Sequence, residues 1–117
     1  MQYILLIYSN EAQDADRSPE EQRESFGEWM AYTNDLKQAG AYVAGDALQP
    51  VATATAVRVR DGERMITDGP FAETKEQLGG YYIIDVPDLD QAIEWAAKCP
   101  GSKQGTMEVR PIMVFDT

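Results

Sequence analysis

The polar residues that could carry out chemistry are concentrated in one irregular segment of the chain, residues 68–80. Turn-forming residues mark both of its ends, because Gly tolerates a positive φ, Pro fixes its own φ, and Gly79-Gly80 stands just before an apolar run. We therefore expect a loop of fixed form, and such loops on rigid scaffolds often hold binding or catalytic groups. The candidates within it are Asp68, Phe71, Glu73, Lys75 and Gln77.

Two aspartates are candidate general bases, Asp68 in this segment and Asp46 earlier in the chain. A carboxylate beside apolar walls holds its proton more readily and can exchange protons with a substrate, while Lys75 or Arg110 could bind an anionic or enolate oxygen. Both aspartates also adjoin Gly, so each could instead cap its own turn. Glu73 and Lys75 fit an exposed charged loop better than an acid–base couple, and Arg110 fits an interfacial or carboxylate-pairing role better than a ligand clamp.

Aromatic residues offer a second kind of candidate site. Trp29 and Tyr32 lie on a predicted helix and could bind a ligand together with Phe71, but large aromatic side chains also dominate the core of any small domain. The remaining aromatics that could line a pocket or fill the core are Tyr3, Tyr8, Tyr42, Tyr81 and Tyr82.

The absence of histidine narrows the possible chemistry, because it removes the commonest general base and metal ligand. No acidic spacing resembles a calcium loop, and no Lys-Ser or Lys-Thr follows Gly79-Gly80, so we expect neither a metal nor a cofactor. Cys99 is the only cysteine and excludes an intrachain disulfide, which favours a structural thiol in a reducing, cytoplasmic setting. We expect no export signal and no membrane span.

Length and charge indicate one acidic globular domain, residues 1–117. The chain is 44% hydrophobic, enough for a core, and its net charge of −10 opposes binding to nucleic acid. Acidic residues dominate positions 11–28, which could face a basic protein or form a solvated helix surface.

The pattern of elements predicts an α+β fold. Strands are expected at residues 3–8, 41–48, 80–86 and 107–115, and a hairpin at 54–67 turns at Asp61-Gly62, with Arg60 opposite Glu63. One helix begins after Ser18-Pro19 and ends before Gly40, with Phe26, Trp29, Met30, Thr33 and Leu36 inward. A second helix begins at Asp88, with Leu89, Ala92, Ile93, Ala96 and Ala97 inward, and stops at Pro100-Gly101.

The order without the hairpin is βαββαβ, a ferredoxin-like arrangement with both helices on one face of an antiparallel sheet. Residues 3–8 and 81–84 are apolar without alternation, so both faces of the sheet need cover. Because two helices cover one face only, we expect the other to pair with a second copy in a homodimer.

The motif Asp68-Gly69-Pro70-Phe71, with residues 3–8, 53–62 and 108–112, resembles the DGPF-domain subgroup of the bacterial YCII-related proteins. The resemblance implies a ferredoxin-like chain that forms a dimeric α+β barrel, often encoded beside extracytoplasmic-function sigma factors. Some YCII-related proteins outside that subgroup carry a helix histidine proposed as catalytic, and Trp29 stands near that position here. The expected function is binding of a small organic molecule in the barrel mouth, with lyase- or isomerase-like activity. The alternative is a regulatory module that contacts a sigma-factor-linked protein.

Overall fold

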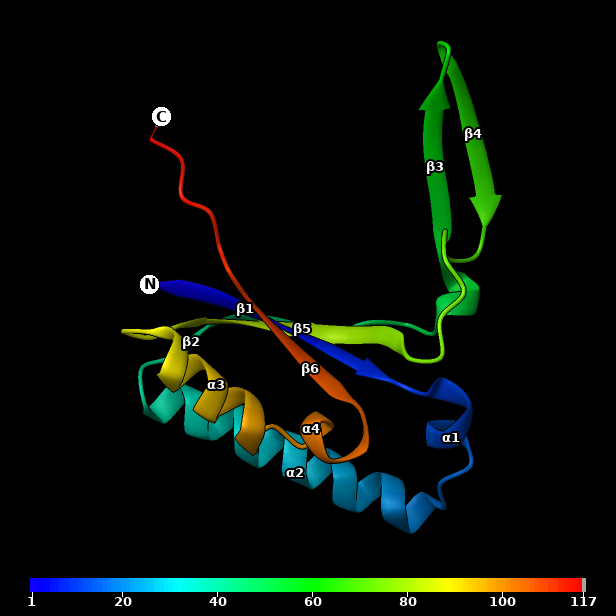
Figure 1. Cartoon of the computed structure of the whole chain (residues 1–117). Coiled ribbons are helices and arrows are strands. Elements are labelled where there is room, and N and C mark those ends of the chain that lie inside the picture. Colours follow the sequence, from blue (N-terminus) through cyan, green and yellow to red (C-terminus); the bar gives the residue numbers. More distant parts are fainter. Residues whose placement is uncertain (117) are drawn as a thin grey trace.

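A computed structural model of the chain describes residues 1–116. It is a mixed α+β structure whose main sheet has the strand order β2-β5-β1-β6, with every neighbouring pair antiparallel. This arrangement is consistent with the predicted ferredoxin-like fold (Figure 1). The four strands are β1 (Gln2–Ser9), β2 (Tyr42–Ala47), β5 (Gln77–Asp85) and β6 (Thr106–Pro111).

Both long helices lie on the same side of this sheet (Figure 1). Helix α2 (Pro19–Gln38) begins with the predicted capping box, in which the Ser18 hydroxyl accepts from Glu21 N and the Glu21 carboxylate accepts from Ser18 N. Helix α3 (Leu89–Lys98) is capped by the Asp88 carboxylate, which accepts from Gln91 N. The structure adds three short helices: α1 (Glu11–Ala15), η1 (Val51–Thr53) and α4 (Gly101–Gln104).

The core lies between these helices and the sheet surface that we call the helix face, which includes Tyr3, Leu5, Tyr82 and Ile84. The predicted inward residues are only partly right. Trp29, Leu36, Ala92 and Ala96 pack there, whereas Phe26, Met30, Leu89 and Ile93 are about half to two-thirds exposed. On α3 the buried side chains are Ala92 and Ala96, with Trp95 packed beside them and Leu89 and Ile93 half exposed. On α2, Phe26 and Met30 border a cavity instead of packed side chains.

The hairpin forms a separate two-stranded sheet of β3 (Thr55–Arg60) and β4 (Glu63–Asp68). Its register agrees with the sequence prediction, including Arg60 opposite Glu63 and Val57 opposite Ile66. Asp61 and Gly62 both have positive φ, as a two-residue turn of this hairpin requires. The hairpin, which we call the arm, stands away from the main sheet on the side opposite the helices (Figure 1).

Two strand ends differ from the sequence prediction. Strand β5 begins at Gln77, so Gly79 and Gly80 lie within it, where a Cβ on Gly80 would stand 2.8 Å from Asp46 O. Gly80 therefore serves a close approach between strands, which its position before an apolar run did not reveal. Strand β6 ends at Pro111 instead of continuing to 115, and after Ile112 N donates to Gln2 O the chain leaves the sheet as a tail, residues 112–116.

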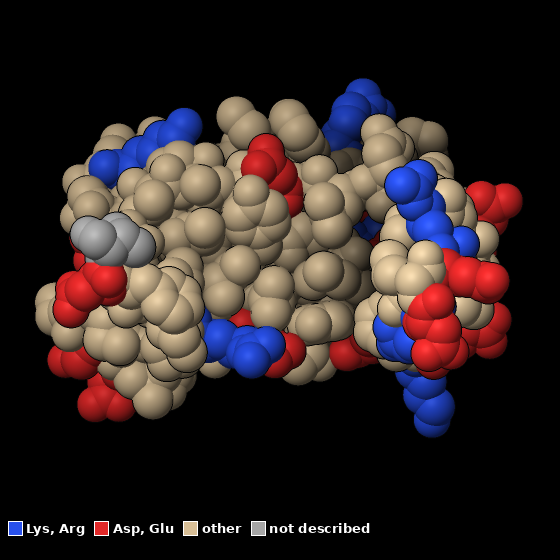
Figure 2. Space-filling model, turned by 90° about the horizontal axis from the view of Figure 1, so that it is seen from above, with Lys and Arg blue, Asp and Glu red and all other residues tan. Residues whose placement is uncertain are grey.

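The second surface of the main sheet, which we call the open face, has no helix over it. Its central side chains are Ile4, Leu6 and Ile83, which alternate with the buried residues of the helix face and are half-buried. The arm and the tail rise on either side of it (Figure 1), and Figure 2 shows this side of the molecule as largely uncharged over its centre. No helix within residues 1–116 is long and apolar enough to cross a membrane.

Candidate functional site

A cavity of about 410 Å³ lies between helix α2 and the sheet strands β1, β2 and β5. Helix α2 contributes Phe26, Trp29, Met30 and Thr33 at helical spacing, which places all four on one side of the helix. Its opposite wall is formed by side chains and backbone of the three strands. The strand residues that line it are Ile7, Ser9, Tyr42, Gly45, Asp46, Ala47, Gly79, Gly80, Tyr81 and Tyr82.

Tyr82 is the centre of the aromatic wall. Its ring stacks with Trp29, with centroids 6.4 Å apart and an interplanar angle of 14°. It also meets Tyr32 and Tyr42 edge to face, at centroid distances of 5.4 and 6.3 Å. Aromatic pairs in these geometries are stabilising beyond the area they bury. These contacts hold the Tyr82 ring in place, and the rings of Trp29, Tyr42 and Tyr82 give the cavity an apolar wall.

Glycines bring the backbone of β2 and β5 close to the cavity. A Cβ on Gly45 would stand 2.7 Å from Cδ1 of Tyr82, and one on Gly80 would stand 2.8 Å from Asp46 O. Any side chain at either position would force the strands or the Tyr82 ring to move. The two glycines thus permit the close packing that fixes the strand side of the cavity.

The hydroxyl groups beside the cavity satisfy one another. Thr33 donates to Trp29 O at 2.9 Å, and because a hydroxyl has a single proton, Tyr82 OH is the donor in its hydrogen bond with Thr33. Burial raises the pKa of Tyr82 above its usual value. Tyr82 therefore stays a neutral phenol near neutral pH and does not act as a base there.

Asp46, one of the two predicted bases, lies on edge strand β2 at the border of the cavity. It pairs directly with Tyr81, whose OH donates to Asp46 Oδ2 at 2.7 Å. This hydrogen bond raises the pKa of Tyr81. Because Tyr81 alternates with the inward Tyr82, both members of the pair lie toward the open face. Tyr81 holds the exposed carboxylate of Asp46 in one orientation at the sheet edge.

The other loop candidates are exposed and none of them lines this cavity. Asp68 ends strand β4, and its carboxylate makes no hydrogen bond within the described part of the chain, so the alternative in which it caps its turn finds no support in the geometry. Phe71 is 78% exposed, and Glu73 and Lys75 are exposed beside it. The structure does not bring Asp68 and Asp46 together in one pocket.

Gln77 connects three segments of the chain through its side-chain amide. Its oxygen accepts from Glu11 N at 3.0 Å, and its nitrogen donates to Thr74 O at 2.7 Å. The Glu11 carboxylate accepts in turn from Val51 N at 3.1 Å. Gln77 and Glu11 together therefore tie the two connections of the arm to α1, and Gln77 does not line the cavity.

The last three sequence candidates fall in different places. Trp29 lines the cavity, whereas Tyr32 is buried in the core and donates to Trp95 O at 2.7 Å. Arg110 pairs opposite Ile4 on the open face, and no carboxylate of residues 1–116 lies within ion-pair distance of it.

Sequence reasoning assigned Phe26, Met30 and Thr33 to the core and so missed them as cavity residues. The signal that could have found them is the width of the apolar stripe on α2. The small sheet can cover only part of this stripe, and that part is filled by Trp29, Tyr32 and Leu36. Phe26 and Met30 are therefore left without a core partner.

Comparison with known proteins places this fold in a family. The model of the YCII-related domain matches residues 1–116. The chain belongs to the YCII-related family. It is 35% identical over 117 residues to an uncharacterized protein of Rhizobium meliloti (strain 1021), with 98% of this chain and 94% of that protein covered.

This YCII-related protein also resembles a solved structure, 5-chloro-2-hydroxyhydroquinone dehydrochlorinase from Burkholderia phenoliruptrix AC1100 in complex with 2,5-dihydroxybenzoquinone. The TM-score is 0.54, the sequence identity is 13%, and the match covers 97% of this chain and 94% of that one. At this identity the likeness concerns the fold alone.

Proposed function

We propose that this YCII-related protein binds a small, largely apolar aromatic molecule in the cavity between α2 and the sheet. The observation that carries this proposal is the cavity itself, about 410 Å³ in volume and lined mainly by aromatic and aliphatic side chains. Sites for small organic ligands have volumes of roughly 300 to 1,000 Å³ and similar linings. The Trp29–Tyr82 stack offers a flat surface for a ring, and the exposed Phe26 and Met30 can close over it.

The charge around the cavity favours a neutral ligand. No Lys or Arg lines it, and the net charge of the chain is −10, which repels anions at long range. Quinones, phenols and other weakly polar rings fit this description better than carboxylates or phosphates.

Lyase- or isomerase-like chemistry is the activity that the site supports. Asp46 is the carboxylate at the border of the cavity, and the hydrogen bond from Tyr81 fixes its orientation. Asp46 is the base that we propose, and because its carboxylate lies toward the open face, a substrate held against Trp29 must extend past the edge of strand β2 to bring an acidic proton to it. The motif Asp68-Gly69-Pro70-Phe71 supports membership of the DGPF-domain subgroup.

We further propose that the protein works as a homodimer joined through the open face, which would close a dimeric barrel. The chain exposes 8533 Å², whereas a compact monomer of 13.0 kDa exposes about 6,300 Å². The excess of about 2,200 Å² is more than the roughly 800 Å² that each partner of a standard stable interface buries. The unpaired Arg110 at the margin of this face could then meet a carboxylate of the second copy.

Ligand binding is tested by thermal shift and tryptophan fluorescence with a panel of phenols and simple quinones, and with benzoates and 2,5-dihydroxybenzoquinone as rings that are anionic at neutral pH. We expect neutral rings to raise the melting temperature and to quench Trp29. The Phe26→Ala/Met30→Ala variant should bind at least about tenfold more weakly, because it removes half-exposed apolar contacts from the cavity rim. Ile93→Ala, a half-exposed residue on α3, is the matched control and should bind normally.

Turnover of any ligand so identified is tested with Asp46→Asn, which keeps the shape of the side chain. We expect loss of activity with binding retained, and Asp68→Asn serves as the comparison. Equal activity of Asp46→Asn and the parent protein would rule out Asp46 as the base.

The alternative function is a regulatory module that contacts a sigma-factor-linked protein. The observation that favours it is the run of exposed acids Glu20, Glu21, Glu24 and Glu28 on α2. If no ring in the panel moves the melting transition and a basic protein is retained by the parent chain, but not by a variant with these four acids changed to Gln, this alternative replaces the ligand-binding proposal.

A further inference from the structure

The arm has one apolar face that nothing in the described chain covers. Val57 and Ile66 pair directly across its two strands, and Val59 lies on the same face two residues further along β3. These three side chains are 59–61% exposed. An isolated two-stranded hairpin is marginally stable in water at best, so the arm needs an outside surface to hold its form.

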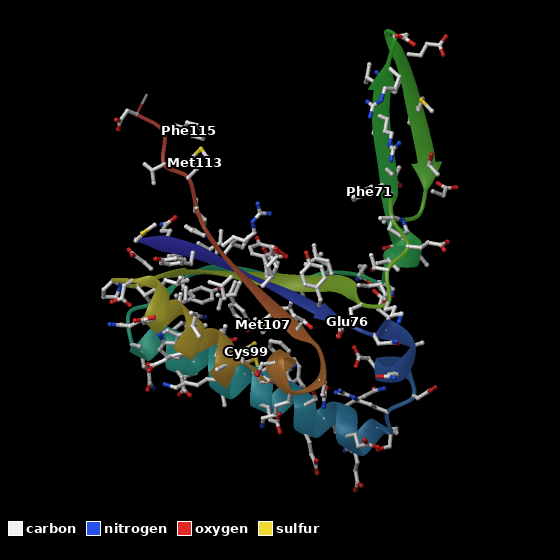
Figure 3. All side chains as sticks on the ribbon, in the orientation of Figure 1. Phe71, Glu76, Cys99, Met107, Met113 and Phe115 are labelled. Carbon is white, nitrogen blue, oxygen red and sulfur yellow. The ribbon has the colours of Figure 1, made fainter. Side chains whose placement is uncertain are left out.

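The tail has the same property at the other side of the open face. Met113, Val114 and Phe115 are 73–82% exposed and follow one another without a polar residue. A run of exposed apolar residues is unfavourable unless a partner covers it. Figure 3 shows Met113 and Phe115 leaving the tail toward the space above the sheet, and Phe71 leaving the base of the arm toward that space from the other side.

The arrangement of the two segments suggests what covers them. Both rise from the main sheet on its open side, at opposite margins (Figure 1), and the molecule measures 48 × 48 × 18 Å, with a radius of gyration of 16.4 Å against about 13 Å for a compact chain of this length. A two-fold axis between two stacked open faces, running across the line from arm to tail, places the tail of each copy beside the arm of the other. Such symmetry forms the contact twice.

We propose that the tail of each copy packs against Phe71 and the apolar face of the arm of a second copy, so that two identical clasps hold the dimer together. This inference rests on the homodimer of the proposed function and names the residues that secure it. The large apolar contacts of each clasp come from Phe71 of one copy and Phe115 of the other. Met113 lies on the same side of the tail as Phe115 (Figure 3). The aromatic residue of the Asp68-Gly69-Pro70-Phe71 motif thereby gains a role at an interface instead of in a ligand pocket.

The first test measures the dimer dissociation constant by sedimentation velocity. Met113→Ser/Phe115→Ser should weaken dimerisation by about 30-fold or more, because a few well-packed apolar anchors dominate such interfaces. Val114→Ser is the matched control, because it removes a smaller apolar residue of the same tail that is also mostly exposed, and it should change the constant by less than about threefold.

The second test is oxidative cross-linking between variants that each carry one introduced cysteine. Copies carrying Phe71→Cys, mixed with copies carrying Phe115→Cys, should form a disulfide-linked dimer, while Val114→Cys should cross-link far less. The native Cys99 is fully buried and does not compete. A chain carrying both Phe71→Cys and Phe115→Cys should link to a second chain and not to itself.

The outcomes separate this inference from the homodimer on which it rests. A parent protein that is monomeric at micromolar concentration overturns both. A dimer of unchanged dissociation constant in Met113→Ser/Phe115→Ser, without the mixed disulfide, overturns the clasp and leaves the homodimer standing. A disulfide closed within one chain shows that the tail covers its own arm, and it also overturns the clasp.

Discussion

The helix face and the open face belong to the same four strands and differ in what covers them. Leu5 on the helix face is completely buried beneath α2 and α3, while the adjacent Leu6 on the open face is only half-buried. Both faces are apolar at their centre, so the sequence of β1 shows no alternation. The contrast shows that an uninterrupted apolar strand need not be covered on both faces by its own chain.

The largest expected effect compares the two leucines directly. Leu5→Ala should lower the free energy of unfolding by about 2 to 5 kcal/mol, because it leaves a cavity in the packed core. Leu6→Ala should cost less and should lose most of its effect when the protein is diluted below the dimer dissociation constant. Urea denaturation at two protein concentrations measures both, and equal losses at every concentration would remove the distinction between the faces.

A smaller effect is expected where β2 meets β5. Gly80→Ala would place a Cβ against the backbone of Asp46, which cannot move aside easily, and should destabilise the protein by about 1 to 3 kcal/mol and weaken ligand binding. Gly79→Ala is the matched control, since its nearest contact would be 3.9 Å, and it should change stability by less than about 0.5 kcal/mol. Thermal unfolding with and without ligand distinguishes the two.

Alkaline pH should lower the free energy of unfolding, because the thiol of Cys99, buried in the folded chain, loses its proton more easily once the chain unfolds. Burial raises the pKa of this thiol to about 11 from a usual value of 9.0. Between these values the unfolded chain releases the proton and the folded chain keeps it, so stability falls as pH rises, by about 2 kcal/mol at pH 11. Unfolding measured from pH 8 to pH 10 should therefore have a shallower slope in Cys99→Ala, and parallel slopes would contradict the assignment.

The smallest effects concern two aspartates at turns. Asp88→Ala removes the cap of α3 and should cost about 0.5 to 2 kcal/mol. Asp68→Ala removes a carboxylate with no hydrogen bond in the described chain, and should change stability by less than about 0.5 kcal/mol. A cost at Asp68 as large as at Asp88 would restore the turn-capping interpretation of Asp68.

The sequence predicted those parts of the fold that local rules determine. The capping box at Ser18, the turn at Asp61-Gly62 and the apolar run of β1 each depend on neighbouring residues, and the structure contains all three. The four-strand order then followed from the usual connections of a βαββαβ chain.

The candidate site was harder to predict because it depends on contacts between distant segments. The cavity exists because Phe26 and Met30 extend past the packed core, and because Gly45 and Gly80 let two strands approach closely. Neither fact has a local signature. By contrast, residues 68–75 were predicted as site residues from their composition alone, and their side chains lie outside this cavity.

The hydrogen bonds that run from Val51 through Glu11 and Gln77 to Thr74 fix the arm only at its base. Within residues 1–116 no hydrogen bond joins the rest of the arm to the main sheet, and each added pair of opposed residues would lengthen both strands equally and leave the turn unchanged. The length of the arm is thus independent of the hydrogen bonds that attach its base to the domain. Relatives could therefore lengthen or shorten this projection during evolution without redesigning the domain that carries it.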